Sequence, residues 1–448
     1  MRNALGILWS ATVLLAAAPG QGQYAASWES LDRRPIPAWF DEAKFGIFIH
    51  WGVYAVPAWA PRDQYAEWYW HWIEQPDHPC RSFHLATYGP KFRYQDFAPM
   101  FKAELFDPAA WATLFKRAGA RYVALTSKHH EGFCLWPSPD SWNWNSVDVG
   151  PHRDLCGELA EAVRAAGLKM GFYYSLYEWY HPVYRADVHR YVDQHMLPQL
   201  KDLVVRYRPA LIFADGEWDH PSSTWRSEEF LAWLFNESPC REEVVVNDRW
   251  GKETRTHHGG YYTTEYGKHA HGEVGVRHKW EESRGLGNSY GYNRNETCED
   301  YTRAADIVWL LVDTVSRGGN LLLNVGPTAD GRIPEIQQER LLQVGQWLAA
   351  NGEAIYATSP WREAAEGDDI RYTTRGNTVY AIVRNPPDSA LRLKTPRPSD
   401  TWSVSLLGRP DPLKASRTAD GLQVEMPPGC PPDPGSVRIA VFRLDGVQ

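Results

Sequence analysis

Several classes of protein are excluded by what this sequence lacks. Lysine and arginine number 47 against 55 aspartate and glutamate residues, so the formal net charge is −8. The sequence contains no stripe of basic residues, so nucleic acid is not an expected partner. Beyond the N-terminal segment no apolar run approaches the roughly 20 residues that span a bilayer, so we expect a soluble mature protein without a membrane partner.

Cysteine is also scarce, with six residues in a chain of 448. They form no Cys-x-x-Cys pair and show no spacing typical of a zinc finger. An even number in an exported chain is compatible with disulfides, but the spacing favours no particular pairing. The six are Cys80, Cys134, Cys156, Cys240, Cys298 and Cys430.

Common catalytic motifs are missing. The sequence contains no His-Glu-x-x-His motif and no Gly-x-Ser-x-Gly elbow. The pairs His129-His130 and His257-His258 are adjacent, and neighbours on a strand point to opposite faces, so neither pair is arranged to chelate one ion. We therefore expect no metal and no organic cofactor, and interpret the histidines as hydrogen-bond donors to hydroxyl groups.

The N-terminus predicts export. Arg2 precedes an apolar run over residues 4–18, and small residues follow. This pattern is typical of a secretory signal peptide, which we assign to residues 1–22 with cleavage near Gly20 or Gly22. The mature protein is expected in the secretory pathway, in the lysosome or outside the cell; the sequence does not choose between these destinations.

Two triplets have the form of glycosylation acceptors. Asn236 begins Asn-Glu-Ser and Asn295 begins Asn-Glu-Thr. Pro239 follows the first triplet and should weaken it. Both asparagines are kept as candidate glycosylation sites.

Aromatic residues are abundant, with 22 tryptophans and 23 tyrosines. A large core would explain this excess. A cleft that stacks the flat apolar faces of sugar rings would explain it equally well, and composition alone does not decide.

The order of the segments predicts a barrel followed by a small β domain. Between about residues 40 and 350, apolar strand-like runs alternate with helical patterns, which is typical of a parallel sheet covered on both faces. A (β/α)8-like barrel over residues 23–357 fits this length. A doubly wound sheet is the alternative, but no glycine-rich turn follows the first strand. Short alternating segments then predict an antiparallel β-sandwich over residues 358–448. The predicted barrel strands are 45–50, 122–126, 168–175, 210–215, 243–247 and 320–325.

Polar residues follow most of these strands. Active sites of barrel enzymes lie at the carboxyl ends of the strands, so these residues are expected to converge on one rim. They are His50, Lys128–Glu131, Tyr173-Tyr174, Asp215–Glu217, Asn247–Arg249 and Asn324.

Carboxylates are the best catalytic candidates on this rim. Asp215 ends an apolar strand, whereas Glu67 and Glu265 lie in aromatic surroundings that raise the pKa of a carboxyl group toward general-acid use. Two carboxylates, histidines and aromatic platforms together form a glycoside hydrolase site. Further candidates are Glu217, Asp219, Glu281 and Glu282.

Longer motifs resemble one family over nearly the whole mature chain. They are Trp39-Phe40, Lys44–Gly52, Glu67–Tyr69, Lys128–Phe133, Asp215–Trp218, Val246–Gly251, His257–Tyr262 and Gly319–Pro327. In these motifs the chain resembles the alpha-L-fucosidases of glycoside hydrolase family 29, most closely the animal lysosomal and secreted type. The resemblance implies a (β/α)8-like barrel with a C-terminal β-sandwich and a fucosylated glycan as substrate, cleaved with retention through a covalent intermediate.

The resemblance also implies roles for individual residues. Asp215 matches the nucleophile. Glu265 matches the acid/base of bacterial relatives and is expected on a loop, with Glu281 as the competing candidate. Phe213 departs from the tryptophan that many relatives have two residues before the nucleophile. The residues implied in fucose binding are His50, Glu67, Trp68, His129, His130, Tyr173 and Arg249.

Two other functions are compatible with the sequence. A fucose-binding lectin on a hydrolase scaffold would lack a usable carboxylate pair, and the presence of both Asp215 and Glu265 argues against it. An inverting glycosidase, or one for another sugar, is the second alternative. The sequence determines neither the linkage preference nor the oligomeric state, and a homo-oligomer is compatible with it.

Overall fold

The computed structural model describes residues 23–267, 278–409, 411–427, 429 and 437–448. The predicted signal peptide and Cys430 lie outside these residues. The remaining cysteines, Cys80, Cys134, Cys156, Cys240 and Cys298, are all free thiols. None of the helices in the described part of the chain is long and apolar enough to cross a membrane.

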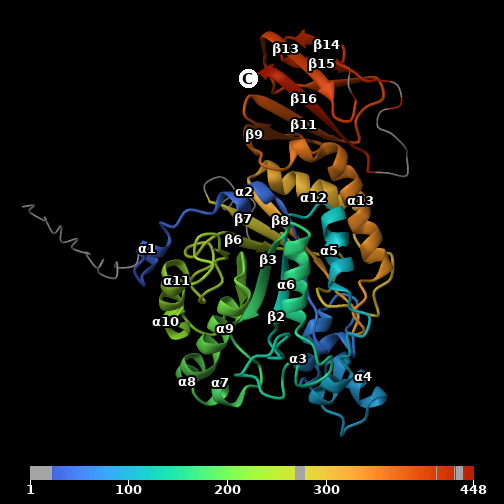
Figure 1. The fold of residues 1–448 in the computed structure, drawn as a ribbon. Helices are drawn as coiled ribbons and strands as arrows, with labels where there is room; N and C mark the ends of the chain where they lie inside the picture. Colours follow the sequence, from blue (N-terminus) through green and yellow to red (C-terminus); the bar gives the residue numbers. More distant parts are fainter. Residues whose placement is uncertain (1–22, 268–277, 410, 428, 430–436) are drawn as a thin grey trace, which may run out of the picture.

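Eight parallel strands form the central sheet, in the order β5-β4-β3-β2-β1-β8-β7-β6 (Figure 1). This arrangement confirms the predicted barrel class. The strands are β1 Phe45–Ile49, β2 Tyr122–Lys128, β3 Lys169–Ser175, β4 Leu211–Asp215, β5 Val245–Val246, β6 Tyr262–Glu265, β7 Trp280–Gly285 and β8 Gly319–Val325.

Two of these strands are absent from the sequence prediction. The sequences of β6 (YTTE) and β7 (WEESRG) are polar, so they lack the apolar run that identifies a buried parallel strand. Their polar side chains are nevertheless mostly buried. By contrast, β1, β2, β4 and β8 are apolar over most of their length and buried at every residue, because helices cover the outer face of the sheet.

Backbone hydrogen bonds close the sheet between its edge strands. The amide of Tyr261, just before β6, donates to the carbonyl of Val246 in β5 at 3.0 Å, and the amide of Gly260 donates to the carbonyl of Asn247 at 3.2 Å. A Cβ atom at Gly260 would lie 1.9 Å from the Val246 oxygen, so only glycine allows this approach. The eight strands therefore surround a common interior.

Helices follow most strands, and several begin with a side-chain cap. Asp107 accepts a hydrogen bond from the amide of Ala110 at 2.9 Å, ahead of a proline at the first position of α5. The described residues between β5 and β6, and between β6 and β7, contain no helix, so the barrel is (β/α)8-like rather than complete. The α-helices are α1 Trp28–Leu31, α2 Ala38–Ala43, α3 Tyr69–Ile73, α4 Pro79–Thr87, α5 Pro108–Arg117, α6 Leu155–Ala165, α7 Pro182–Ala186, α8 Val188–Tyr191, α9 Leu197–Tyr207, α10 Ser222–Trp225, α11 Ser227–Asn236, α12 Ala304–Ser316 and α13 Glu335–Asn351. Short 3-10 helices cover Val53–Ala55, Ala66–Trp68, Tyr94–Met100 and Gly352–Ala354, and a π-helix covers Val192–Met196.

The C-terminal part consists of two antiparallel sheets that share a separate apolar core, as the predicted sandwich requires. One sheet has the order β13-β16-β11-β10-β9 and the other β12-β15-β14. Their strands are β9 Ser359–Glu366, β10 Ile370–Arg375, β11 Thr378–Arg384, β12 Ala390–Leu393, β13 Pro398–Leu406, β14 Ala415–Thr418, β15 Gly421–Glu425 and β16 Ile439–Val447.

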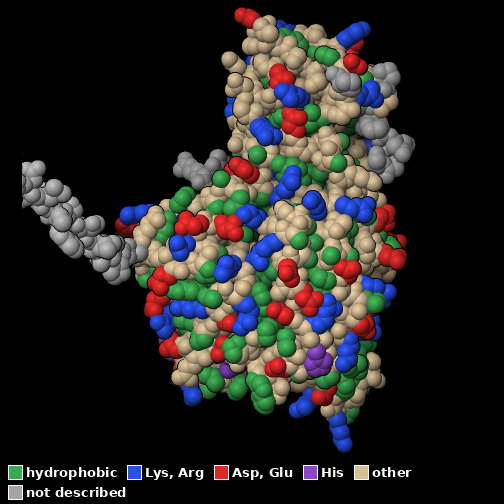
Figure 2. Space-filling model, in the orientation of Figure 1, with side chains coloured by type: hydrophobic (Ala, Val, Ile, Leu, Met, Phe, Trp, Pro, Cys, Tyr) green, Lys and Arg blue, Asp and Glu red, His purple; other side chains and the backbone are tan. Residues whose placement is uncertain are grey.

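This sandwich is attached to the side of the barrel that α12 and α13 cover (Figure 1). Arg384 in β11 forms an ion pair with Asp306 in α12 at 2.7 Å. The indole of Trp347 in α13 donates to the carbonyl of Ile439 in β16 at 3.0 Å. On the face shown in Figure 2, charges of both signs are mixed, with no field of basic residues.

Candidate active site

Polar residues from several strand ends converge on one pocket at the carboxyl end of the barrel. The following residues of the predicted rim do not line it: Lys128, Glu131, Tyr174, Glu217, Asn247, Asp248 and Asn324. Every residue implied in fucose binding lines it, together with Asp215 and Glu265, so the structure brings the predicted site residues together. The lining residues are Phe48, His50, Tyr65, Glu67, Trp68, His129, His130, Tyr173, Phe213, Asp215, Trp218, Arg249, Glu265, Ser283 and Tyr290.

Asp215 is the last residue of β4 and is held from both sides. The hydroxyl of Tyr173 donates to its Oδ2 at 2.9 Å, and Nη1 of Arg249 donates to its Oδ1 at 2.8 Å. Burial alone would raise the pKa of Asp215, but the positive charges of Arg249 and Arg255 and the hydrogen bond from Arg249 together outweigh burial and hold the pKa well below the usual aspartate value. The carboxylate is therefore ionised and oriented toward the pocket.

Glu265 is the last residue of β6, which corrects the expectation that it lies on a loop. The prediction failed because β6 is too polar to be identified as a strand. The hydroxyl of Tyr65 donates to Oε1 at 3.2 Å, and Nη2 of Arg249 contacts Oε2 at 3.3 Å. Its side chain is 30% exposed, against 11% for Asp215. Glu265 thus lies nearer to solvent than Asp215.

Arg249 joins the two carboxylates. Its guanidinium bonds both Asp215 and Glu265, and its Nε donates to Oγ1 of Thr263 at 3.0 Å. Its Cζ also lies 4.9 Å from the ring centroid of Phe213, so phenylalanine provides an aromatic face at this position. One arginine therefore fixes the relative positions of both carboxyl groups.

His50 follows β1 and has a defined tautomer. Its Nδ1 lies 2.7 Å from Oδ1 of Asn324, whose amide nitrogen donates to the carbonyl of Tyr290 at 2.6 Å and so fixes the amide orientation. Nδ1 must then carry the proton. Burial lowers the pKa of His50 well below its usual value, so the ring is neutral and Nε2 is an acceptor.

His130 is arranged in the same way. Its Nδ1 lies 2.7 Å from Oγ of Ser175, and that hydroxyl donates to the carbonyl of Tyr177 at 2.7 Å. The hydroxyl proton is used there, so Nδ1 of His130 is the donor and Nε2 is left with a lone pair. In these tautomers His50 and His130 each present an acceptor nitrogen to the pocket, whereas the sequence interpretation described them as donors, because the donor nitrogen is bonded within the protein.

His129 lies between these two rings and is positioned by stacking. Its ring centroid is 5.6 Å from that of Tyr173, with an angle of 13° between the planes. Its Nδ1 lies 3.6 Å from Oε2 of Glu131, and neither atom has a hydrogen-bond partner among the described residues. Burial lowers the pKa of His129 to about 3 and raises that of Glu131 to about 8, so both groups are neutral between these values.

Glu67 and Trp68 are placed by the 3-10 helix Ala66–Trp68. Oε2 of Glu67 accepts from the amide of Gly291 at 2.8 Å and from Oγ of Ser289 at 3.1 Å. Burial raises the pKa of Glu67 to about 7, and these hydrogen bonds oppose the shift.

Glu281, the competing acid/base candidate, lies outside the pocket. It is the second residue of β7, whereas the pocket is formed at the ends of the strands. The hydroxyl of Tyr122, the first residue of β2, donates to its Oε2, and its Oε1 has no partner among the described residues. Glu281 therefore belongs to a buried polar cluster at the amino end of the barrel.

The buried position of Glu281 predicts a pH-dependent effect on the stability of the protein. Burial raises the pKa of Glu281 to about 7, above the value of about 4.3 in an unfolded chain. The folded protein favours the neutral acid, so this stabilisation is complete below about pH 4.3 and is lost as pH rises toward 7. The substitution Glu281→Gln keeps Lys279 nearby but removes the titrating group. We therefore expect the free energy of unfolding of the variant, minus that of the wild type, to rise by on the order of 3 kcal/mol between pH 4.5 and 7.5. Urea titrations at both pH values measure this difference; an unchanged difference would show that Glu281 is ionised in the folded protein.

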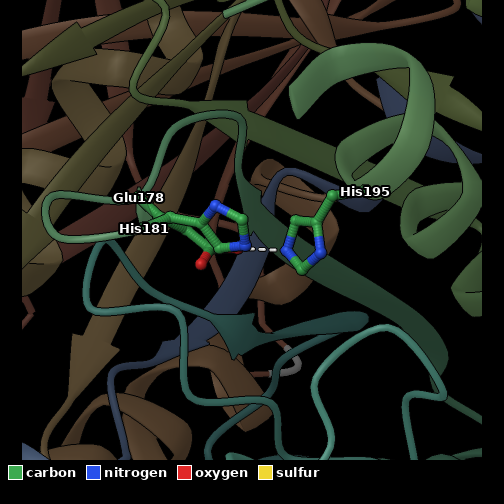
Figure 3. Close-up of side chains that lie close together, drawn as sticks. All are labelled: Glu178, His181 and His195. Atoms are coloured by element: carbon green, nitrogen blue, oxygen red, sulfur yellow. Dashed lines mark hydrogen bonds and ion pairs between the residues drawn. The ribbon is translucent and has the colours of Figure 1, made fainter. Parts of the chain in front are cut away.

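One further cluster has the composition of a metal site. Glu178, His181 and His195 are the one such group found among the described residues (Figure 3). However, Oε1 of Glu178 already accepts from Nε2 of His195 at 2.8 Å and from Nζ of the buried Lys128 at 2.9 Å. Burial would raise the pKa of Glu178, but Lys128 and the hydrogen bond from His195 together outweigh it, lower the pKa and keep the carboxylate ionised. A divalent cation would have to bind beside a buried ammonium group, so we interpret the cluster as an ion-pair network.

Several pocket residues were missed by sequence reasoning. Tyr65 is close in sequence to Glu67, and Trp218 is close to Asp215. This proximity is the one sequence feature that could have identified them as pocket residues. Ser283 and Tyr290 belong to or follow β7, which was not recognised as a strand. Phe48, the penultimate residue of β1, also lines the pocket.

The two candidate glycosylation asparagines are both engaged within the chain. Asn236 ends α11, and its side chain accepts from the amide of Tyr24 at 3.0 Å and donates to the carbonyl of Tyr24 at 2.8 Å. Asn295 donates from Nδ2 to the carbonyl of Ala60 at 2.7 Å, while Thr297 of its triplet is exposed. Modification of Asn236 would disturb its paired contact with the N-terminal segment, so Asn295 is the better candidate.

Comparisons with known proteins agree with this geometry. The family model described as "Alpha-L-fucosidase" matches residues 11–353, and the model described as "Alpha-L-fucosidase C-terminal domain" matches residues 365–443. The chain is 50% identical to a tissue alpha-L-fucosidase of Bos taurus over 89% of this chain and 86% of that protein. It is 48% identical to the tissue alpha-L-fucosidase of Homo sapiens over 95% and 92% of the two chains.

Solved structures show the same relationship. An alpha-fucosidase of Thermotoga maritima, in complex with a mechanism-based inhibitor, superposes with a TM-score of 0.82 at 38% identity, covering 94% of this chain and all of that one. An alpha-L-fucosidase isoenzyme of Paenibacillus thiaminolyticus superposes with a TM-score of 0.75 at 30% identity, covering 92% and 98% of the chains. Together with the pocket, these matches show that the chain belongs to the alpha-L-fucosidase family and is a glycosidase that acts on alpha-L-fucosides.

Proposed function

We propose that the protein is a retaining exo-glycosidase that removes terminal alpha-L-fucose from glycoproteins, glycolipids and oligosaccharides, with Asp215 as nucleophile and Glu265 as acid/base. The observation that supports this most strongly is the shared guanidinium of Arg249. It contacts the ionised Asp215 and the more exposed Glu265 at 2.8 and 3.3 Å, so two carboxyl groups at the ends of β4 and β6 flank one site. A pair of carboxyl groups in distinct environments is what glycoside hydrolysis requires.

The proposed reaction has two steps. An oxygen of Asp215 attacks the anomeric carbon as the glycosidic bond breaks, and Glu265 transfers its proton to the departing oxygen. Glu265, now a carboxylate, then takes a proton from water, and the resulting nucleophile displaces Asp215 from the sugar. Arg249 stabilises whichever carboxyl group bears the negative charge, because it contacts both.

The rest of the pocket supports recognition of a 6-deoxy sugar. Nε2 of His50 and of His130 are acceptors for sugar hydroxyl protons, as argued above from their tautomers. Phe48 and Phe213, with ring centroids 5.0 Å apart, provide an apolar surface for the methyl group. One solved relative, the Thermotoga maritima enzyme, is described in complex with fucose.

The alternative is a catalytically weak fucose-binding protein on the same scaffold. It would use the hydroxyl-binding residues without the carboxylate pair. We further propose that the protein is exported and acts in the lysosome or outside the cell, in line with relatives named as tissue and plasma enzymes. An assembly of several copies is compatible with this proposal.

The anomer of the first product tests the mechanism. A panel of nitrophenyl glycosides should show turnover of the alpha-L-fucoside alone. Proton NMR during early hydrolysis should then show alpha-L-fucose before mutarotation mixes the anomers, because two inversions restore the configuration. Early beta-L-fucose would contradict the nucleophile role of Asp215, and binding of fucose without turnover would favour the alternative.

A further inference from the structure

One aromatic side chain of the pocket is exposed to solvent. Trp218 is 38% exposed, whereas Tyr173, Phe213 and Phe48, which also line the pocket, are 1 to 2% exposed. A single exposed ring needs no explanation by itself, and Trp142 is more exposed still. Trp218 differs because it also lines the pocket, so its open surface faces the space that a ligand would occupy.

Contacts of the neighbouring residues hold this ring in place. The indole of Trp225 donates to the carbonyl of Glu217 at 3.1 Å, and the Glu217 side chain is paired with Arg255. On the other side, the hydroxyl of Tyr184 donates to Asp219 at 2.7 Å. The chain turns immediately before, at Gly216, which has a φ of +75° that favours glycine. Trp218 is thus presented on an anchored turn, so little conformational entropy is lost when a ligand binds.

The ring has the surroundings of a stacking platform. It meets His130 and Tyr177 edge to face, with centroids 5.3 and 5.5 Å away, and it lies 6.1 Å from Trp68 at an angle of 33°. Its indole N–H makes no hydrogen bond to any residue in the described ranges. An open apolar ring with a free donor at its edge matches a pyranose, which has an apolar C–H face and hydroxyl groups at its rim.

The depths of the two carboxyl groups in the pocket indicate which sugar of the substrate would contact Trp218. Asp215, the proposed nucleophile, is the more buried, and Glu265, which protonates the leaving oxygen, is the more exposed. The fucose ring must then occupy the buried floor, and the group that leaves must extend through the mouth, where Trp218 lies. We propose that Trp218 forms a second subsite, which binds the pyranose to which the fucose is attached. This inference rests on the proposed function and specifies the substrate as a fucosylated sugar rather than any fucoside.

Two substrates that differ only in the leaving group test the subsite. Wild type, Trp218→Ala and Trp218→Leu are assayed with methyl alpha-L-fucoside and with the fastest-cleaved disaccharide among fucosyl-galactose and fucosyl-N-acetylglucosamine isomers. Loss of stacking should lower kcat/KM for the disaccharide about tenfold in both variants. kcat/KM for the methyl fucoside and the inhibition constant of free L-fucose should change clearly less than this, because these ligands carry no second sugar. Any loss transmitted through His130, which the ring contacts, falls on both substrates alike, so the ratio of the two kcat/KM values reports on the subsite. The leucine side chain in Trp218→Leu would retain apolar packing against Tyr177 without a flat face, so this variant reports on stacking even if the alanine variant is unstable.

Trp142 provides the matched control, since it is 80% exposed and lies outside the pocket. Trp142→Ala should leave both substrates unaffected. Equal losses on both substrates, or no loss on either, would overturn the subsite. Failure of the wild-type protein to hydrolyse any fucoside would instead contradict the proposed function, so the two failures are distinguishable.

Discussion

Asp215→Gly is expected to lower kcat about 10⁴-fold or more, which corresponds to at least about 5 kcal/mol of lost transition-state stabilisation. The reason is geometric: Tyr173 and Arg249 each hold one of its oxygens at the end of β4, whereas Glu67, the other deeply buried carboxyl group of the pocket, is bonded to Gly291 and Ser289. With the side chain removed, nothing at the end of β4 can bond to the anomeric carbon. Rates with nitrophenyl alpha-L-fucoside, together with circular dichroism to confirm folding, measure the effect.

Added azide should restore part of this activity, because the small anion fits the space that the carboxylate vacates next to Arg249. The control is Asp77→Gly, an exposed residue outside the pocket, whose activity should match wild type and should not respond to azide. More than a few per cent residual activity in Asp215→Gly without azide would show that another group is the nucleophile.

The barrel could be predicted from the sequence wherever its strands are apolar. Runs such as FGIFI and NLLLNV identify strands buried on both faces, and six of the eight were found in this way. The strands β6 and β7 could not be found, because they bury polar side chains on both faces: Glu281 faces the barrel interior, whereas Thr264 and Glu282 are hydrogen-bonded to each other on the outer face. A polar strand of this kind is stable only through partners that lie far away in the sequence, and periodicity does not reveal them.

The residues of the candidate site could be predicted from the sequence, but their chemical roles could not. Position after a strand identified Asp215 and the histidines, since parallel strands end at one rim. The roles of His50 and His130 as acceptors depend on Asn324 and Ser175, which fix the tautomers from neighbouring strands. The choice between Glu265 and Glu281 likewise depends on where each lies along its strand, at the end of β6 or at the start of β7.

If Glu265 is the general acid, the effect of replacing it depends on the leaving group of the substrate. A general acid matters most when the departing oxygen is a poor leaving group, and its contribution is typically about 10²- to 10⁴-fold. Glu265→Ala should therefore reduce kcat/KM by about this factor for a fucosyl disaccharide, and far less for an activated aryl fucoside. Tyr65 and Arg249 contact Glu265 but have no carboxyl proton to give, so they cannot replace it. Steady-state kinetics on the two substrates measure the contrast.

Glu281→Gln is the matched control, because Glu281 is also a buried carboxyl group of the barrel but contacts Tyr122 at the opposite end. It should affect both substrates equally, through stability alone. The reverse result, a leaving-group contrast in Glu281→Gln and none in Glu265→Ala, would exchange the two roles. It would also require the amino end of β7 to reach the pocket, a rearrangement that the pairing of Glu281 with Asn320 in the barrel sheet opposes. The more exposed carboxyl group at the end of β6 is therefore the one positioned to protonate a leaving sugar at the pocket mouth.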